Sequence, residues 1–283
     1  MTEMIEVQFG EALQEALSGV LSSPSHRALE IGGPTTYFDE LYKWIDQAKG
    51  GNIDNVVRPL VDEYEIENFQ RRGGVMVEGA CAEGGEGGEC EEGGMYPYEI
   101  NGALLGKQYF AHGADLPFED ESYGFIMASH NLEHYPNPLK ALLEWDRVLK
   151  PGGYMFLNLP DPRYTFDRRR EVSDMSQLLK CYNAEAGLSK EDAFQYLVER
   201  KIQGILSITA FEQTKGETEK EAEERWRAMV GNGREDDSWV DKFHWHVFDP
   251  GLMEEIFKCL GYEVVGMAGV APFHMMSIAK KNG

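Results

Sequence analysis

The stretch SYGFIMASHNLEHYPNPLKALLEWDRVLKPGGYMFLNLP, residues 122–160, decides the fold because two apolar strands flank one helix in it. Residues 122–130 are almost continuously apolar, as in a strand buried on both faces. Residues 137–150 predict an amphipathic helix, which a Pro-Gly-Gly turn ends, and 153–160 form the second apolar strand. The expected apolar face of the helix comprises Leu139, Leu142, Leu143, Trp145 and Leu149. A strand–helix–strand unit predicts a parallel sheet with right-handed crossovers.

Further strands and helices are predicted on both sides of this unit. The remaining strands cover 27–32, 52–57, 108–116, 262–268 and 273–280, and the remaining helices cover 5–21, 36–48 and 250–260. Asp249 is a favourable N-cap and Pro250 a favourable first residue for the last helix. This alternation predicts an α/β fold with a mostly parallel, seven-stranded sheet and helices on both of its faces.

Two segments interrupt the alternation within what we expect to be a single domain over residues 1–283. Residues 73–94 hold nine glycines and six glutamates without a basic residue, so they cannot bury enough apolar surface to offset their ordering entropy. We interpret them as a flexible acidic loop. Residues 161–243 are mostly helical and polar in pattern. This insertion either forms a helical cap over the carboxyl ends of the strands, where such sheets bind ligands, or only adds surface.

The net charge of −22, from 49 acidic and 27 basic residues, argues against nucleic-acid phosphates and anionic membranes as partners. No apolar run approaches the ~20 residues of a membrane span, and the N-terminus lacks the pattern of a signal peptide. The four cysteines, Cys81, Cys90, Cys181 and Cys259, show no metal-type spacing. Cys81 and Cys90 can form a disulfide within one loop, but reduced cysteines and a cytoplasmic location are the simpler expectation.

LEIGGPT, residues 29–35, ends a predicted strand on an acid and then places two glycines side by side. Glu30 is costly to bury without a partner, and adjacent glycines suit a special backbone conformation. Gly32 and Gly33 let the backbone approach a bound molecule, while the carboxylate of Glu30 suits an ammonium or hydroxyl partner. We therefore expect a ligand site at this junction, although many nucleotide-binding folds share such a turn.

Two further acids follow predicted strands. Asp54 is expected at the end of the second strand, where a carboxylate can accept hydrogen bonds from ribose hydroxyls. Asp115 follows the third strand in GADLPF, where it can accept a hydrogen bond from an exocyclic amine. Leu116 and Phe118 can flank a planar base there. Acids that end three consecutive strands indicate a shared ligand site.

LEIGGPT and residues 113–160 together resemble the class I S-adenosylmethionine-dependent methyltransferases. The longer block is similar to the run from the third to the fifth strand in the small-molecule branch of that family. RYTFDRRR (163–170) and HWHVFDP (244–250) resemble a bacterial-type subgroup associated with methylation of glycans or other small molecules. The resemblance covers roughly residues 27–60, 108–170 and 244–280. It implies a Rossmann-like fold, S-adenosylmethionine as cofactor and a small-molecule acceptor.

The resemblance also implies roles for individual residues. Glu30, Gly32 and Gly33 match the motif that holds the methionine part of the cofactor, Asp54 matches the ribose-binding acid, Asp115 and Leu116 match the adenine site, and Ser129 and His130 match the strand end beside the sulfonium and the acceptor. In one departure from the family pattern, Pro34 and Thr35 stand where a third glycine is usual.

A sulfonium is already an activated methyl donor, so the protein has to align an acceptor and remove its proton. Histidine suits the second task because its unperturbed pKa is ~6.5. His130 is the predicted base, and His244 and His246 are predicted to bind the acceptor. Arg163, in the basic cluster RYTFDRRR, either recognises a phosphate or carboxylate on the acceptor or pairs with nearby acids.

Three other hypotheses about the function are open at this point. His130–His134 spells H-x-x-E-H, a zinc-peptidase motif, but that chemistry requires a continuous helix and Pro136 follows almost at once, so we expect no metal. A nicotinamide-dependent oxidoreductase would normally carry G-x-G-x-x-G, which the chain lacks. The third is a methyltransferase-like scaffold without turnover. The acceptor, its reacting atom and the oligomeric state do not follow from the sequence.

Overall fold

The computed structural model describes residues 27–35, 53–57, 95–100, 103–185, 244–270 and 273–283, with a few isolated positions besides. Four predicted features lie outside the described residues: the helices at 5–21 and 36–48, the acidic loop at 73–94 with Cys81 and Cys90, and most of the predicted cap at 161–243.

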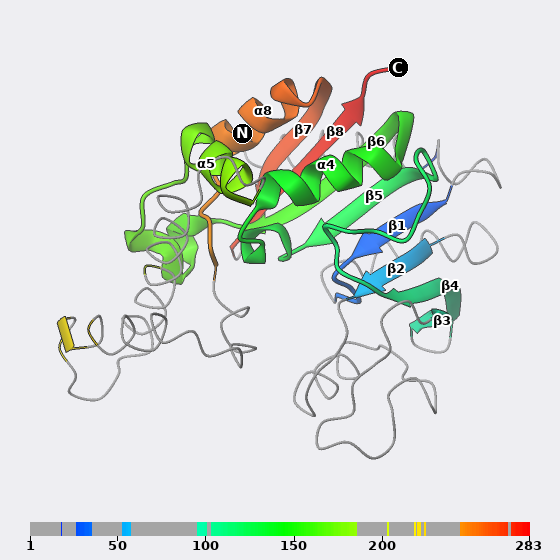
Figure 1. Ribbon diagram of the computed structural model, residues 1–283, viewed down its shortest axis with the longest axis horizontal. Coiled ribbons are helices and arrows are strands. Elements are labelled where there is room, and N and C mark those ends of the chain that lie inside the picture. Colours follow the sequence, from blue (N-terminus) through cyan, green and yellow to red (C-terminus); the bar gives the residue numbers. More distant parts are fainter. Residues whose placement is uncertain are drawn as a thin grey trace, which may run out of the picture.

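Eight strands among the described residues form one mixed sheet, in the spatial order β3-β4-β2-β1-β5-β6-β8-β7 (Figure 1). They are β1 (Ala28–Ile31), β2 (Ile53–Val57), β3 (Met95–Ile100), β4 (Ala103–Phe110), β5 (Tyr123–Ser129), β6 (Leu149–Pro160), β7 (Tyr262–Val270) and β8 (His274–Lys281). The central strands, from β4 across to β6, pair in parallel. β3 pairs antiparallel at one edge, and β8 and β7 extend the other edge antiparallel. The sheet is therefore Rossmann-like, with the carboxyl ends of its parallel strands at one edge.

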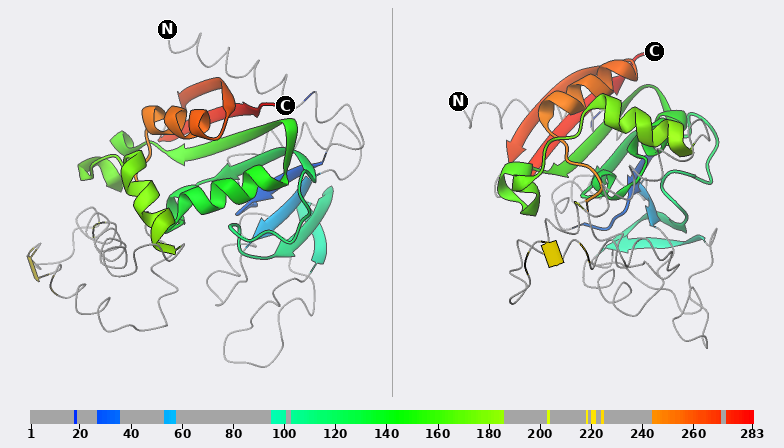
Figure 2. Two further views of the ribbon diagram at one scale, coloured as in Figure 1. Left: turned by 45° about the horizontal axis from the view of Figure 1, so that its top comes forward. Right: turned by 60° about the vertical axis from the view of Figure 1, so that its left-hand side comes forward.

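Three helices pack on one face of this sheet: α4 (Pro138–Val148), α5 (Met175–Glu185) and α8 (Pro250–Cys259) (Figures 1 and 2). Their side chains, among them Trp145 and Phe257, share a hydrophobic core with β1, β5 and β6. A second apolar cluster, including Phe125, covers the opposite face. The helices predicted for that face lie outside the described residues, so helices on both faces stay a prediction. None of the described helices is long and apolar enough to cross a membrane.

Most predicted elements that fall on described residues are confirmed to within two residues of their bounds. These are the strands at 27–32, 52–57, 122–130, 262–268 and 273–280 and the helices at 137–150 and 250–260. The predicted N-cap is also present, since the side chain of Asp249 accepts a hydrogen bond of 2.8 Å from the backbone N–H of Leu252. Local patterns were sufficient for these elements because each is a well-bounded apolar run or helix.

The predicted count of seven strands is wrong because it omits β3, residues 95–100. This strand directly follows the glycine-rich acidic run and contains Pro97, which argues against a central strand. Proline is tolerated because β3 is an edge strand with exposed side chains at alternate positions. The hairpin with β3 also makes β4 start at Ala103, five residues before the predicted start at 108, and β4 ends at Phe110, six residues before the predicted end at 116.

Two parts of the predicted apolar face of α4 are wrong as well. Leu149 is buried but is the first residue of β6, which begins four residues before the predicted start at 153. Leu143 is 41% exposed, whereas Leu142 and Trp145 are fully buried. Consecutive helical residues differ by about 100° around the axis, so Leu142 and Leu143 cannot both face the sheet. The buried residues of the helix are Pro138, Ala141, Leu142, Trp145 and Val148.

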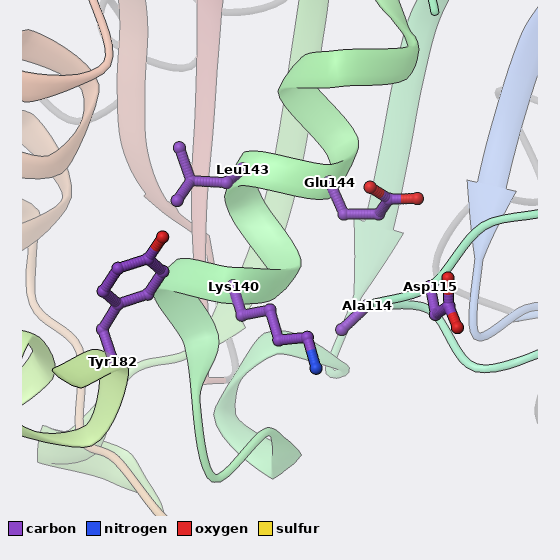
Figure 3. A pocket seen from close by; sticks show the side chains of 6 residues that line it. All are labelled: Ala114, Asp115, Lys140, Leu143, Glu144 and Tyr182. Atoms are coloured by element: carbon purple, nitrogen blue, oxygen red, sulfur yellow. The ribbon is translucent and has the colours of Figure 1, made fainter. Parts of the chain in front are cut away.

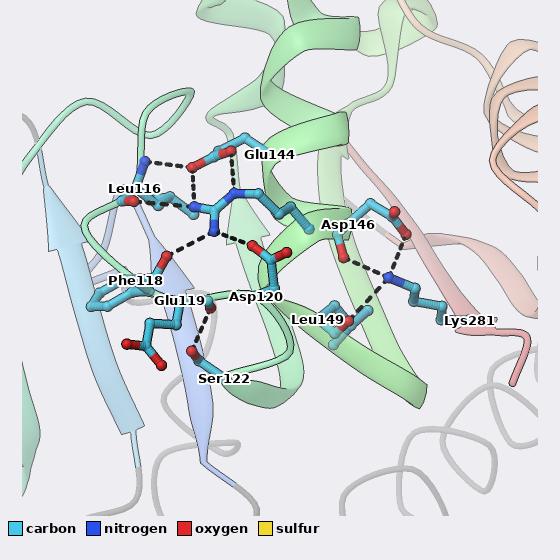
Figure 4. Close-up of polar contacts among 10 residues, drawn as sticks. Leu116, Phe118, Glu119, Asp120, Ser122, Glu144, Asp146, Leu149 and Lys281 are labelled. Carbon is cyan, nitrogen blue, oxygen red and sulfur yellow. Dashed lines mark hydrogen bonds and ion pairs between the residues drawn. The ribbon is translucent and has the colours of Figure 1, made fainter.

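Glu144 and Arg147 of α4, which form an ion pair within the helix, hold the loop between β4 and β5 against it through contacts with loop residues (Figure 4). Arg147 donates to both carboxylate oxygens of Glu144, at 2.6 and 2.8 Å, and to the carbonyl of Phe118 at 2.8 Å. Glu144 in turn accepts from the backbone N–H of Leu116 at 2.8 Å. Partial burial opposes ionisation of Glu144, but the hydrogen bonds from Arg147 and Leu116 outweigh it and lower the pKa of the carboxyl.

We expect Glu144→Gln to lower the free energy of unfolding by about 1 kcal/mol at pH 7. Because the folded pKa of Glu144 is depressed, its contribution is present above the unfolded pKa and is lost as the pH falls through the folded value. The difference in the free energy of unfolding between wild type and variant, measured with urea, should therefore shrink as the pH falls from about 5 to about 3 or below, the range in which ordinary carboxyl groups titrate. Glu254→Gln, at an exposed pair with Lys258, is the control and should change little at any pH. A gap independent of pH would contradict this account.

Candidate functional site

The candidate site lies at the carboxyl ends of β1, β5 and β6. The strand register aligns these ends, since Ile31 pairs with Ala128 and Ser129 pairs with Asn158. The described start of the predicted cap, with the 3-10 turns at Pro162–Tyr164 and Phe166–Arg169, follows β6 directly at this edge. Side chains that are distant in the chain are thereby brought together where open α/β sheets bind ligands.

The glycine pair after β1 gives room to a buried acid and an amide. Gly32 has φ +81°, and a Cβ there would lie 2.3 Å from the side-chain nitrogen of Asn131. A Cβ on Gly33 would lie 2.0 Å from Oε1 of Glu30. Glu30 itself is fully buried, and its Oε2 accepts a hydrogen bond of 2.6 Å from the hydroxyl of Tyr98. The acid and the two glycines are thus a single packed unit, because no larger residue fits beside the carboxylate.

The prediction that Asp54 lies at the end of the second strand is wrong. Asp54 is the second residue of β2, opposite Leu29, and it is fully buried. It forms an ion pair with Arg27 and accepts hydrogen bonds from the hydroxyl of Tyr123 at 2.8 Å and the backbone N–H of Lys107 at 3.0 Å. Both carboxylate oxygens are therefore engaged within the protein, at the end of the strand opposite to the ligand edge.

Asp115 is exposed in the loop after β4 and borders an open pocket of about 420 Å³ (Figure 3). The other lining residues come from the same loop, α4 and α5: Ala114, Lys140, Leu143, Glu144 and Tyr182. Leu116 is 5% exposed in the main core, and its backbone N–H already donates to Glu144. Of the two residues predicted for the adenine site, only Asp115 presents its side chain to solvent in this structure.

Ser129 and His130 end β5 as predicted. The hydroxyl of Ser129 accepts a hydrogen bond of 3.0 Å from the side chain of Asn158. His130 has φ +47°, a left-handed conformation that costs a non-glycine residue about 1–3 kcal/mol and is concentrated at functional sites. Its Nε2 lies 2.9 Å from Nδ1 of His274, whose pKa is lowered by burial.

Glu133 lies at the centre of a histidine cluster and is fully buried. Its Oε1 is 3.6 Å from Nδ1 of His130 and 3.8 Å from Nε2 of both His134 and His244. Neither carboxylate oxygen has a hydrogen-bond partner among the described residues. Burial raises the pKa of Glu133 to about 7, with the nearby Asp167 adding to the effect and His244 opposing it. The H-x-x-E-H motif does not form a continuous helix, because residues 132–134 are a 3-10 turn.

His244 is oriented by an acid from the turn after β6. Its Nδ1 lies 2.5 Å from Oδ2 of Asp167, whose Oδ1 accepts from Arg170 at 2.8 Å. Arg170 also donates to the carbonyls of His244 and Trp245, at 2.7 and 3.0 Å. Burial opposes ionisation of Asp167, but its contacts with His244 and Arg170 outweigh it and lower the pKa of the carboxyl. Nδ1 of His244 is therefore the donor, and Nε2 faces Glu133.

The other two residues predicted to bind the acceptor are engaged elsewhere. His246 is buried, and its Nε2 lies 3.0 Å from the carbonyl of Pro136, to which its N–H can donate. Arg163 has an exposed side chain and forms a bidentate ion pair with Asp161. Pairing of the basic cluster with nearby acids, one of the two alternatives from the sequence, therefore holds for Arg163 and also for Arg170.

Sequence reasoning missed the parts played by Glu133, Asp167 and His274. Glu133 was considered only within the zinc-peptidase motif, and Asp167 only as one letter of a basic cluster. Only Glu133 carries a local signal, because it stands beside His134; the other partners are 77 residues apart for Asp167 with His244 and 144 apart for His130 with His274.

Residues 103–157 match a family model described as a methyltransferase domain. The match covers β4, β5, α4 and most of β6, the segment that contains Ser129, His130 and Glu133. It is a part of the chain, and the function of the whole protein does not follow from it alone.

Among curated proteins, an uncharacterised protein of Methanocaldococcus jannaschii is 32% identical over 99 residues, which are 35% of this chain and 47% of that protein. Demethylmenaquinone methyltransferase of Staphylococcus haemolyticus is 45% identical over 47 residues, 16% of this chain and 20% of that enzyme. The chain thus spans about half or less of the curated relatives that it matches.

Solved structures with similar folds include a methyltransferase from Aquifex aeolicus described as SAM-dependent, with 14% identity, a TM-score of 0.41 and coverage of 94% of this chain and 88% of that one. The PH0226 protein of Pyrococcus horikoshii has 12% identity, a TM-score of 0.46 and coverage of 96% and 89%. Both TM-scores are too low to support a conclusion about function.

We expect Asp54→Asn to act on stability rather than on ligand binding. The variant loses the ion pair with Arg27 and weakens the buried hydrogen bond from Tyr123, so the free energy of unfolding should fall by about 1–3 kcal/mol. Urea unfolding measures this loss, and Tyr123→Phe should give a smaller loss in the same direction. Unchanged stability together with weaker binding of S-adenosylmethionine would restore Asp54 to the ligand site.

Proposed function

We propose that this chain transfers a methyl group from S-adenosylmethionine to a small polar acceptor, such as a hydroxyl of a sugar or glycan. The observation that carries the proposal is the match of residues 103–157 to a methyltransferase-domain model. That segment supplies the end of β5, which lies in register beside the end of β1 and its glycine turn. The cytoplasmic location expected from the sequence is part of the same proposal.

The residues at the sheet edge fit such a cofactor. The carboxylate of Glu30 is fixed by Tyr98 against the backbone of Gly33, and carboxylates are good partners for ammonium and hydroxyl groups. We assign Glu30, Gly32, Gly33 and Ser129 to the methionine end of the cofactor and Asp115, with the adjoining Leu116, to the adenine end. Asp54 is no longer assigned, because its contacts are internal.

When bound, S-adenosylmethionine supplies an activated methyl group. The chain itself must remove a proton from the acceptor, and we assign this step to Nδ1 of His130. We take Nε2 of the same ring as the donor to Nδ1 of His274, 2.9 Å away, so that Nδ1 of His130 is the basic nitrogen. The buried carboxylate of Glu133, 3.6 Å from Nδ1, stabilises the imidazolium that forms. His244 also contacts Glu133 and is assigned to the acceptor site. Arg163 and His246 are less suited to bind the acceptor, because Arg163 pairs with Asp161 and His246 lies against the carbonyl of Pro136.

Cofactor binding can be tested by calorimetric titration with S-adenosylmethionine. We expect Asp115→Ala to weaken binding about 10- to 150-fold, since a hydrogen bond to a charged group is worth about 1.5–3 kcal/mol. Glu119→Ala, an equally exposed acid of the same loop, is the matched control and should bind like the wild type. Absence of binding to the wild-type chain would refute the proposal and favour a scaffold role, whereas binding of NADH instead would favour the oxidoreductase.

Turnover can be tested by following demethylation of S-adenosylmethionine with a panel of sugars and other small hydroxylated acceptors. His130→Asn suits this test because asparagine tolerates a left-handed backbone but cannot act as a base. We expect kcat to fall about 10²- to 10⁴-fold while the affinity for S-adenosylmethionine stays unchanged. Wild-type turnover in this variant would show that His130 is not the base.

A further inference from the structure

The histidine cluster around Glu133 has a second property that methyl transfer does not require. Glu133, His134 and His244 each direct a potential ligand atom to a common centre, and these atoms lie within 4.8 Å of one another. We propose that these three side chains bind a divalent transition-metal ion of the zinc type. This goes beyond the proposed function.

The first support is the environment of Glu133. Its side chain is fully buried, and both carboxylate oxygens lack a hydrogen-bond partner among the described residues. Burying a carboxylate without compensation is costly, so native proteins pair buried charges or use them to bind metals. The surrounding histidine nitrogen atoms, at 3.6–3.8 Å from Oε1, are too far away for hydrogen bonds. A cation between these groups would supply the partner that the carboxylate lacks.

The second, independent support is the orientation of His244. A metal-ligating histidine usually donates its other ring N–H to a carboxylate, which fixes the tautomer and makes the ligand nitrogen more basic. Nδ1 of His244 makes this contact with Asp167, which is itself held by Arg170, and Nε2 faces Glu133. The carboxylate–histidine arrangement is therefore already present on the side away from the proposed ion.

The donor set and the spacing suit zinc or a similar ion. Two imidazoles and one carboxylate are a known zinc ligand set that leaves a fourth position open for water or for an oxygen of another ligand. Metal–ligand distances of about 2.0–2.1 Å place tetrahedral ligand atoms about 3.3 Å apart. The pairs measured at 3.8 Å need to close by only a few tenths of an ångström each. His134 can supply this movement because it ends a three-residue 3-10 turn and its side chain is 28% exposed.

The proposed site differs from that of the zinc peptidases with the same motif. In those enzymes both histidines of H-x-x-E-H bind the metal from one helix and the glutamate acts as a base. In this chain His244 comes from a distant segment and replaces His130, which is hydrogen-bonded to His274. Glu133 becomes a ligand instead of a base.

The test is a titration of the full chain, first stripped of metal with a chelator and dialysed, with Zn²⁺ by calorimetry and with Co²⁺ by visible absorption. We expect about one ion per chain and an intense Co²⁺ spectrum of low-symmetry, four-coordinate type. Glu133→Gln and His134→Ala should each weaken binding at least 100-fold, and Asp167→Asn, which removes the carboxylate that orients His244, about 10- to 100-fold. His112→Ala removes an exposed histidine outside the cluster and should bind like the wild type.

Circular dichroism identifies any variant that fails to fold, and the partly exposed His134 keeps the test decisive if the variant of the buried Glu133 does not fold. Absence of Zn²⁺ and Co²⁺ binding to the wild-type chain would overturn the proposal, as would unchanged binding in folded His134→Ala. The titrations need no methyl donor, so a failure of S-adenosylmethionine binding would leave their result intact. Conversely, the donor can be titrated in the presence of chelator, which separates failure of the metal proposal from failure of the methyltransferase proposal.

Discussion

Parallel pairing of β5 with β1 on one side and β6 on the other is the constraint on which the rest of the structure depends. Every residue of β5 is buried, so the strand has to be covered on both faces and paired on both edges. The pairing places the ends of all three strands at one edge. It thereby brings the glycine turn after β1, His130 after β5 and the turn with Asp167 after β6 into one region.

The polar groups buried at this edge are stabilised to different degrees. Asp167 is compensated, because His244 and Arg170 contact it directly and lower the pKa of its carboxyl. Glu133 is not compensated in this way, because the surrounding histidine nitrogen atoms lie beyond hydrogen-bond distance and burial raises the pKa of its carboxyl. Two acids in one cluster thus have opposite electrostatic environments, a pattern that is concentrated at functional sites.

Methyl transfer and metal binding are compatible at this edge. The residues assigned to the cofactor come from the ends of β1 and β5 and from the loop after β4, whereas the proposed ion lies between the turn after β5 and residue 244. An ion with an open coordination position can bind an oxygen of a polar acceptor and orient it. His130 adjoins both groups, because its Nδ1 lies 3.6 Å from Oε1 of Glu133 and it directly follows the strand that pairs with β1.

Local sequence patterns are sufficient to predict the α/β class, the central strands, α4 and α8, and the glycine turn with Glu30, because these depend on periodicity, capping and turn chemistry within short segments. The same patterns place Ser129 and His130 correctly at a strand end. Three features required the folded structure: the internal contacts of Asp54, the eighth strand β3, and the meeting of Glu133, Asp167, His244 and His274. Strand register and the pairing of residues far apart in the chain decide those features, and neither leaves a local pattern. Side-chain burial then determines which acids are paired inside the protein and which are left to bind a ligand.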